Sequence, residues 1–287
     1  MSDATKSDIS LDRKRLCNPW AHLDENGGFS AFTPIASQLS NRPTERFAAE
    51  CSRFLQRTRS VKDPSDTQIM EFAVELQRML WREHVRQNGG MSPSDPIQVL
   101  DPAFAIKRLG YGYHEEDTLG EMRNNGQTVE VAGVIDHESR HVKISKRHPP
   151  VTRLFSAAHE LGHLLMHPQG GLHRDLPMDG ARIARDKRER QADKFASYFL
   201  MPEKLLREEF KKRFLTEQFR ISDETAFALA NTTQSDLQRK ASSLRALSRL
   251  LSEAQSYNRI RFISLAQQFG VSREAMAIRL EEIGAIS

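Results

Sequence analysis

The chain has 287 residues, a mass of 32.8 kDa and a formal net charge of +4 at pH 7. This length exceeds one average domain and predicts two or three modules around a sizeable core. Hydrophobic residues make up 38% of the chain, but no run approaches the ~20 apolar residues that span a bilayer, so we expect a soluble protein without a membrane anchor. The first twenty residues lack the apolar centre of a secretory signal, which favours a cytoplasmic location.

The N-terminal third of the sequence predicts a helical region that follows a disordered start. Residues 1 to about 40 are polar and have no sustained periodicity, whereas residues 44–59 and 66–87 carry apolar side chains at helical spacing. Cys17 and Cys51 are the only cysteines and do not form a C-x-x-C pair, which excludes a disulfide framework and a cysteine-rich metal site. The glycine- and proline-rich residues 87–96 mark a first domain boundary.

The next segment combines a short helix with β-structure. Asp101 and Pro102 supply an N-cap and a first-turn proline, Gly110 can end the helix, and an extended stretch begins at Tyr111. Two β-rich runs, 129–135 and 141–145, are joined by polar turn residues and predict a hairpin. A helix follows almost directly, so the order of elements predicts an α+β domain with a small antiparallel sheet.

That helix, residues 154–167, contains the signature His159-Glu160-x-x-His163. At about 3.6 residues per turn the two histidines lie some 40° apart on one face, so that both imidazoles can bind one metal ion. Glu160 lies at the edge of this face, where it can act as a general base on a water molecule at the metal without binding the metal itself. The same spacing also arises by chance on an amphipathic helix, so the motif alone leaves both interpretations open.

A hydrolytic zinc site normally has three protein ligands and one open position, so a third ligand is needed. His167 lies eight residues after His159, roughly 12 Å along the helix axis, and is a poor candidate because three imidazoles cannot easily converge from one straight helix. Glu189 shares the apolar face of a second predicted helix, 189–201, and can complete the set, although composition alone favours an ordinary surface Glu in a charged helix. Asp193, one turn later, could hydrogen-bond a ligating histidine and orient its ring.

Residues 97–205 resemble the ImmA/IrrE family of metallopeptidases. The resemblance rests on Arg153-Leu154-Phe155, on Ala158-His159-Glu160-Leu161-Gly162-His163 with His167, and on Glu189-Arg190-Gln191-Ala192-Asp193-Lys194-Phe195-Ala196 followed by Phe199-Leu200-Met201-Pro202. It implies a zincin-like fold and one Zn²⁺ per chain, bound by His159, His163 and Glu189, with Glu160 as catalytic base. It also implies a protein substrate, because family members cleave helix-turn-helix repressors of the Xre type and so relieve repression of stress-response or mobile-element genes.

The C-terminal region, residues 206–287, is expected to be helical and to end in a helix-turn-helix-like pair. Residues 263–269 and 273–283 form two amphipathic runs separated by Gly270-Val271-Ser272, the spacing of that motif. Direct DNA binding is one interpretation; a helical pair that packs or binds protein is favoured, because Met276, Ala277, Ile278 and two acidic residues make the second helix a poor phosphate-binding surface.

These observations predict three parts: an N-terminal helical region (1–92), a zincin-like catalytic domain (93–205) and a C-terminal helical domain (206–287). The favoured function is a cytoplasmic zinc endopeptidase that acts on a transcriptional repressor. The alternative is a DNA-binding regulator that retains the zincin scaffold for structural reasons. We also expect the strand Val142-Lys143-Ile144-Ser145 to be an edge strand beside the cleft, where an extended substrate could add to the sheet.

Overall fold

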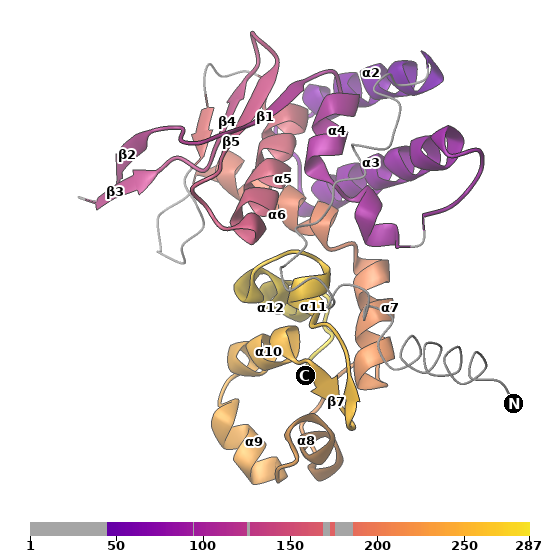
Figure 1. The fold of residues 1–287 in the computed structure, drawn as a ribbon, viewed down its shortest axis with the longest axis vertical. Coiled ribbons are helices and arrows are strands. Elements are labelled where there is room, and N and C mark those ends of the chain that lie inside the picture. The colour runs from indigo at the N-terminus through magenta and orange to yellow at the C-terminus, as the bar shows by residue number, and fades with distance from the viewer. Residues whose placement is uncertain (1–44, 94, 125–126, 169–172, 176–185) are drawn as a thin grey trace, which may run out of the picture. The chain divides into compact units, whose positions relative to one another are not determined.

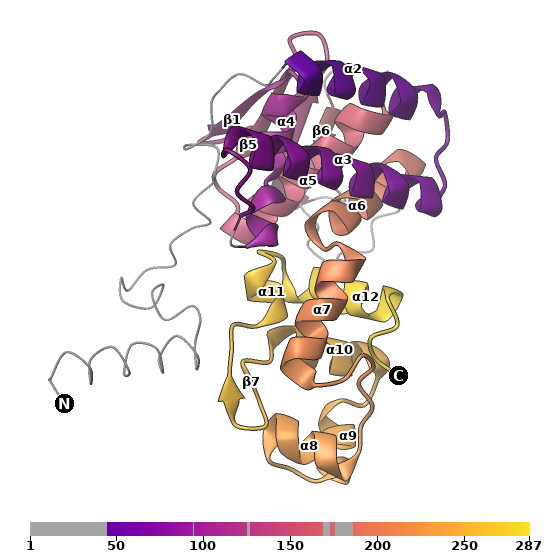
Figure 2. The same cartoon turned by 90° about the vertical axis from the view of Figure 1, so that its right-hand side faces the viewer.

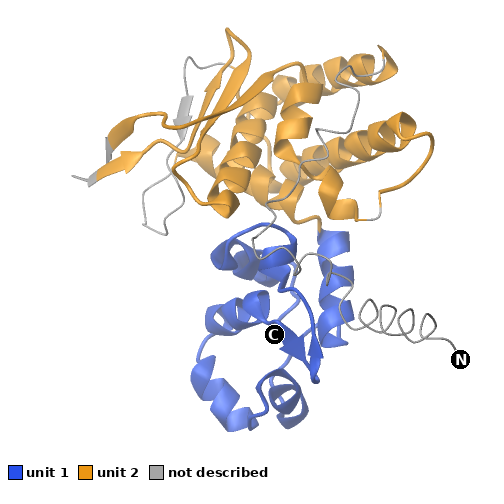
Figure 3. Ribbon diagram, viewed as in Figure 1, with its two compact units in different colours: residues 1–33, 203–287 blue, residues 34–202 orange. Residues whose placement is uncertain are grey.

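The computed structural model describes residues 45–287 except 94, 125–126, 169–172 and 176–185 (Figure 1). The expected disordered start and Cys17 therefore lie outside the described residues. The chain divides into a larger unit, Pro34–Pro202, and a smaller unit made of Met1–Thr33 and Glu203–Ser287 (Figure 3). Among the described helices, none combines the length and the apolar character needed to cross a membrane.

Helices α2 (Glu45–Ser60) and α3 (Asp66–Gln87) begin and end close to the predicted bounds. Ser65 caps α3 and forms a capping box with Gln68, which explains the sharp helix start. The apolar faces of these helices pack against α5 (Pro150–Met166) and α6 (Lys187–Leu200), so both helices belong to the larger unit. The expected boundary near residue 92 lies inside this unit, because the breaker residues form only a connecting turn before the short 3₁₀ helix η3 (Pro96–Val99).

A four-stranded sheet forms one layer of the larger unit. Its strands lie in the order β1-β5-β4-β6, with a separate β2–β3 hairpin (Figure 1). The strands span β1 Gly112–Glu116, β2 Glu121–Asn124, β3 Gln127–Glu130, β4 Gly133–Asp136, β5 His141–Ser145 and β6 His173–Asp175. The predicted hairpin is present as β4–β5, but the predicted first run, 129–135, divides between β3 and β4. Strand β1 runs parallel to β5, so the sheet is mixed rather than wholly antiparallel.

Helix α5 connects the sheet to the other helices of the larger unit. It packs against β4 and β5 and also contacts α2, α4 (Pro102–Arg108) and α6 (Figures 1 and 2). Apolar side chains of α5 from Ala157 to Leu165 are buried, and α6 contributes two phenylalanines with stacked rings. These fully or almost fully buried core residues are Ala157, Ala158, Leu161, Leu164, Leu165, Phe195 and Phe199. The α+β class is confirmed, with α5 as the central helix of the unit.

The described part of the smaller unit is mainly helical. It contains α7 Glu203–Phe214, α8 Asp223–Ala230, α9 Gln234–Lys240, α10 Leu244–Glu253, β7 Ser256–Tyr257, β8 Ile260–Arg261, α11 Leu265–Gln268 and α12 Arg273–Glu282. An aromatic cluster of Phe210, Phe214, Phe219 and Tyr257 forms its core. Helix α10 ends at Glu253, and Asn258 and Arg259 adopt positive φ in the turn of the β7–β8 hairpin that follows.

Candidate metal centre

His159 and His163 lie one turn apart on α5 and face the same side of the helix. Both side chains are buried, and their Nε2 atoms are 3.0 Å apart. Pro150 starts the helix at its first position, where the missing N–H removes no intrahelical bond. The helix then continues unbroken to Met166. The motif therefore brings two imidazole nitrogens to one point, as its spacing predicts.

Glu189 reaches the same point from α6. Asp186 caps this helix and accepts a hydrogen bond from the Glu189 backbone N–H at 2.9 Å, which places Glu189 in the first turn. The two carboxylate oxygens of Glu189 each lie 3.4 Å from one Nε2 atom, one from His159 and the other from His163. Within the described residues, one ligand atom from each of the three side chains falls within 4.8 Å of the other two.

The geometry of these three residues fits a tetrahedral metal ion. The two Nε2 atoms are 3.0 Å apart, and each lies 3.4 Å from a different carboxylate oxygen of Glu189. Bonds of about 2.0–2.1 Å to zinc at tetrahedral angles place neighbouring donors about 3.3 Å apart. Two imidazole nitrogens and one carboxylate oxygen also form a donor set typical of catalytic zinc, in which a fourth position is open. The three residues could therefore hold a metal ion without rearrangement of either helix.

Asp193 lies one turn after Glu189, and its Oδ1 is 2.9 Å from the Nδ1 atom of His159. Because Nε2 of His159 faces the other donors, the ring proton belongs on Nδ1, and Nδ1–H donates to the Asp193 carboxylate. A carboxylate in this position fixes the tautomer and the orientation of the ring and increases its basicity. Asp193 is therefore placed where it could take the role predicted from the sequence, the orientation of the His159 ring.

Glu160 is fully buried, and its side chain lies against the backbone of β4. A Cβ atom added to Gly133 would stand 2.6 Å from Oε1 and 2.9 Å from Cγ of Glu160, so only glycine leaves room for this carboxylate. Gly133 was not among the site residues predicted from the sequence. It could have been found as an isolated glycine in a β-rich run, since such a glycine often marks a close backbone approach.

His167 lies outside the donor group. Its Nδ1 atom is 3.1 Å from Nδ1 of His163, the ring nitrogen that points away from His159 and Glu189. Residue 167 is the C-cap of α5, where the chain leaves the helix. His167 is therefore a neighbour of a candidate ligand.

The expectation that Val142, Lys143, Ile144 and Ser145 form an edge strand is wrong. These residues lie on β5, which pairs with β1 on one side and with β4 on the other. The backbone groups of an internal strand are used within the sheet, so β5 offers no free edge to a substrate. The strand beside Glu160 is β4, and β6 pairs with its outer side.

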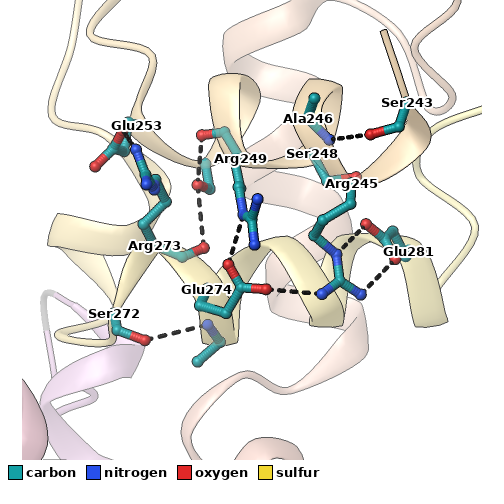
Figure 4. A network of polar contacts seen from close by, with 12 residues as sticks. Ser243, Arg245, Ala246, Ser248, Arg249, Glu253, Ser272, Arg273, Glu274 and Glu281 are labelled. Carbon is teal, nitrogen blue, oxygen red and sulfur yellow. Dashed lines mark hydrogen bonds and ion pairs between the residues drawn. The ribbon is translucent and has the colours of Figure 1, made fainter. Parts of the chain in front are cut away.

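The helix-turn-helix-like pair is α11 and α12, separated by Gly270 in a positive-φ turn. Met276, Ala277 and Leu280 of α12 are buried, and Arg245 and Arg249 of α10 form ion pairs with its acidic side chains (Figure 4). Arg245 also contacts both carboxylate oxygens of Glu281 (Figure 4).

Hydrogen bonds from Arg249 and Arg245 lower the pKa of Glu274, and the bond from Arg245 lowers that of Glu281. These two glutamates are therefore held as anions on α12. Arg245 and Arg249 of α10 neutralise their negative charge, so this pairing does not give α12 a basic surface for DNA recognition.

The part of the chain that contains this site matches a known protein family. Residues 122–239 match the model of the IrrE N-terminal-like domain of peptidase family M78, and this match includes α5 and α6 with all the donor atoms described above. Neither the curated proteins nor the solved structures contain a match to the chain. The match thus assigns residues 122–239, which include the candidate metal centre, to the IrrE N-terminal-like domain of peptidase family M78.

Proposed function

We propose that this chain is a zinc-dependent endopeptidase. The observation that carries the proposal is the convergence of His159, His163 and Glu189, with Glu160 as a fully buried carboxylate next to His159 on the same helix. This arrangement supplies three ligands and a general base from two helices, the minimum for metal-assisted peptide hydrolysis. The family match independently supports a metallopeptidase-type activity.

The residues have distinct proposed roles. A zinc ion held by His159, His163 and Glu189 would supply Lewis acidity toward the scissile carbonyl and the attacking water. Glu160 takes the proton from the attacking water and later delivers it to the leaving amine. Asp193 keeps the ring of His159 in the tautomer that binds through Nε2. Gly133 leaves the space in which the Glu160 carboxylate sits.

The proposed substrate is a helix-turn-helix repressor of the Xre type, whose cleavage would relieve repression of stress-response or mobile-element genes. Support for this substrate comes from the resemblance to the ImmA/IrrE family, and a peptidase requires a protein substrate in any case. A repressor acts on DNA, so the proposed compartment is the cytoplasm.

The alternative function, a DNA-binding regulator on a zincin scaffold, has less support. It requires α12 to present a free, basic face to the major groove. Instead, Met276, Ala277 and Leu280 are buried, and Glu274 and Glu281 are paired with arginines of α10. Retardation of a DNA probe by the metal-free protein would favour this alternative.

The test of the proposed function is Glu160→Gln. The amide cannot accept the proton from water but leaves the three donor residues intact, so zinc content should stay near one ion per chain. Cleavage of purified helix-turn-helix repressors from the same organism, followed by gel electrophoresis and mass spectrometry, should fall by about 10²- to 10⁴-fold.

Wild-type protein treated with a chelator and then reloaded with zinc serves as the control, because it should lose and regain cleavage. Turnover by Glu160→Gln within about tenfold of the wild type would refute the role of Glu160 as base.

A further inference from the structure

Both helices that carry the candidate ligands end just before a proline, which leaves one carbonyl of each without its helical donor. In α5 the carbonyl of Leu164 would normally accept from residue 168, but Pro168 has no N–H. Arg59 of α2 supplies the missing donor through Nε and Nη2, at 3.3 Å and 3.0 Å from the Leu164 oxygen. Helix α2 thus completes the C-terminal end of the histidine helix.

Helix α6 is completed in the same way from α3. The carbonyl of Tyr198 faces Pro202 four residues later and therefore has no backbone donor at that position. The side-chain amide of Gln77 donates to Tyr198 at 2.9 Å and to the carbonyl of Phe199 at 3.0 Å. The N-terminal helical pair consequently holds the ends of both helices that carry donor residues.

A third connection runs from the turn between α2 and α3 to a candidate ligand. The Gln191 amide nitrogen donates at 3.0 Å both to Asp63 Oδ1 and to the buried carbonyl of Pro64. The Gln191 amide oxygen lies 3.0 Å from Nε2 of His167, whose Nδ1 is 3.1 Å from Nδ1 of His163. These hydrogen bonds link the α2–α3 turn to His163 through Gln191 and His167, and we call this chain of contacts the relay.

The groups at the two ends of the relay determine which atom donates and which accepts in each of its hydrogen bonds. A carboxylate and a carbonyl can only accept, so the Gln191 nitrogen donates to Asp63 and Pro64 and its oxygen must accept from His167. His167 Nε2 then carries the ring proton, and its Nδ1 is an acceptor. If Nε2 of His163 binds a metal ion, Nδ1 of His163 carries a proton that it must donate. His167 Nδ1 is the acceptor for that proton.

We propose that the turn between α2 and α3 is a positioning element of the metal centre, which acts through Gln191 and His167 on the ring of His163. This inference rests on the proposed metal site, and it assigns a function to a region outside the segment that matches the family model. Asp193 orients His159 from α6, whereas the relay orients His163 from the α2–α3 turn. Each histidine then has its own hydrogen-bonded support.

Zinc affinity, measured by competition with a chromogenic chelator on the full chain, tests the relay without any peptide substrate. His167→Phe keeps an aromatic ring but removes the acceptor, and Gln191→Met keeps the side-chain length but removes all three hydrogen bonds of the amide. Each should lower zinc affinity by about 10- to 100-fold, the usual effect of losing a partner of a metal ligand. His167→Asn restores an acceptor oxygen near the position of Nδ1 and should recover most of the affinity.

The matched control is Gln77→Met, which removes an equivalent side-chain amide from an N-terminal helix but does not touch the relay. It should reduce the free energy of unfolding of the metal-free protein while leaving zinc affinity within a few-fold of the wild type. Urea unfolding of every metal-free variant shows which of them are folded and separates lost stability from lost ring orientation.

Proton NMR gives a second measure. The zinc-loaded wild type should show a slowly exchanging imidazole N–H from His163 that is absent from His167→Phe and present in Gln77→Met. Equal loss of affinity in Gln191→Met and Gln77→Met, or wild-type affinity in Gln191→Met and His167→Phe, would overturn the relay but leave the proposed function standing. If the wild type binds no zinc, both proposals fail together.

Discussion

Gly162 on α5 lies so close to Ala192 on α6 that a Cβ atom at position 162 would stand 3.1 Å from the Ala192 Cα and 3.3 Å from its carbonyl oxygen. The neighbouring atoms belong to helix backbone, so they cannot turn aside as a flexible side chain could. This close approach sets the distance between the helix that carries His159 and His163 and the helix that carries Glu189. The close approach of the Ala192 backbone therefore explains why residue 162, inside the motif, is a glycine.

The first prediction concerns Gly162→Ala. In an exposed helix this change would stabilise the protein by about 1 kcal/mol, because alanine has the higher helix propensity. Here the added methyl group forces two packed helices apart, and overpacking typically costs about 1–3 kcal/mol. We expect a net loss of stability in urea unfolding of the metal-free protein, together with weaker zinc binding in chelator competition. Increased stability would show that α5 and α6 tolerate the methyl group.

The second prediction concerns Gly133→Ala, which places a methyl group where the Glu160 carboxylate lies. The side chain of Glu160 must move, whereas the three donor residues keep their positions. We expect cleavage to fall by about 10²-fold or more, as for loss of a general base, with zinc content unchanged. The matched control is Gly112→Ala on β1, where the added atom would meet the ring of His141 instead. Full loss of activity in the control as well would point to general damage to the sheet.

The third prediction concerns the identity of the third ligand. Glu189→Ala removes one of three donors and should empty the site, with a loss of affinity well beyond the about 10- to 100-fold expected for a hydrogen-bonding partner. His167→Ala removes only such a partner and should still bind one zinc ion at saturating metal concentration. Elemental analysis of both proteins after gel filtration decides between them. An empty site in His167→Ala and a full one in Glu189→Ala would reverse the assignment.

Helices could be predicted from the sequence where local signals agreed. Helix α3 begins and ends as expected, because Ser65 and Gln68 form a capping box and the apolar residues follow a single face. Helical spacing alone aligns His159 with His163, whereas the choice of Glu189 as the third candidate ligand also needed the family resemblance, because spacing did not distinguish it from a surface glutamate.

The arrangement of strands could not be predicted in this way. Alternation of side chains shows that residues 141–145 form a strand but contains no information about which strands lie beside it. The parallel pairing of β1 with β5 joins segments that are distant in sequence. Because of this pairing, β5 is an internal strand and not the expected edge strand. Three long-range contacts could not be predicted either: Arg59 with α5, Gln77 with α6 and Gln191 with His167. In the sequence each of these polar side chains looks like part of an ordinary helix surface.

The last prediction concerns Asp193, whose carboxylate accepts the hydrogen bond from Nδ1 of His159. Asp193→Ala should leave all three donors in place but allow the His159 ring to rotate and to adopt the other tautomer, so zinc affinity should fall by about 10- to 100-fold. Asp193→Asn retains an acceptor oxygen without the negative charge and should fall between Asp193→Ala and the wild type. Chelator competition with zinc measures this series, and the absorption spectrum of the Co²⁺-substituted protein reports the geometry of the donors. Because Asp193 and Gln191 support different histidines, Asp193→Ala combined with Gln191→Met should show the sum of the two single effects on the free energy of zinc binding. Wild-type affinity in Asp193→Ala would mean that the packing of α5 against α6 alone holds His159 in place.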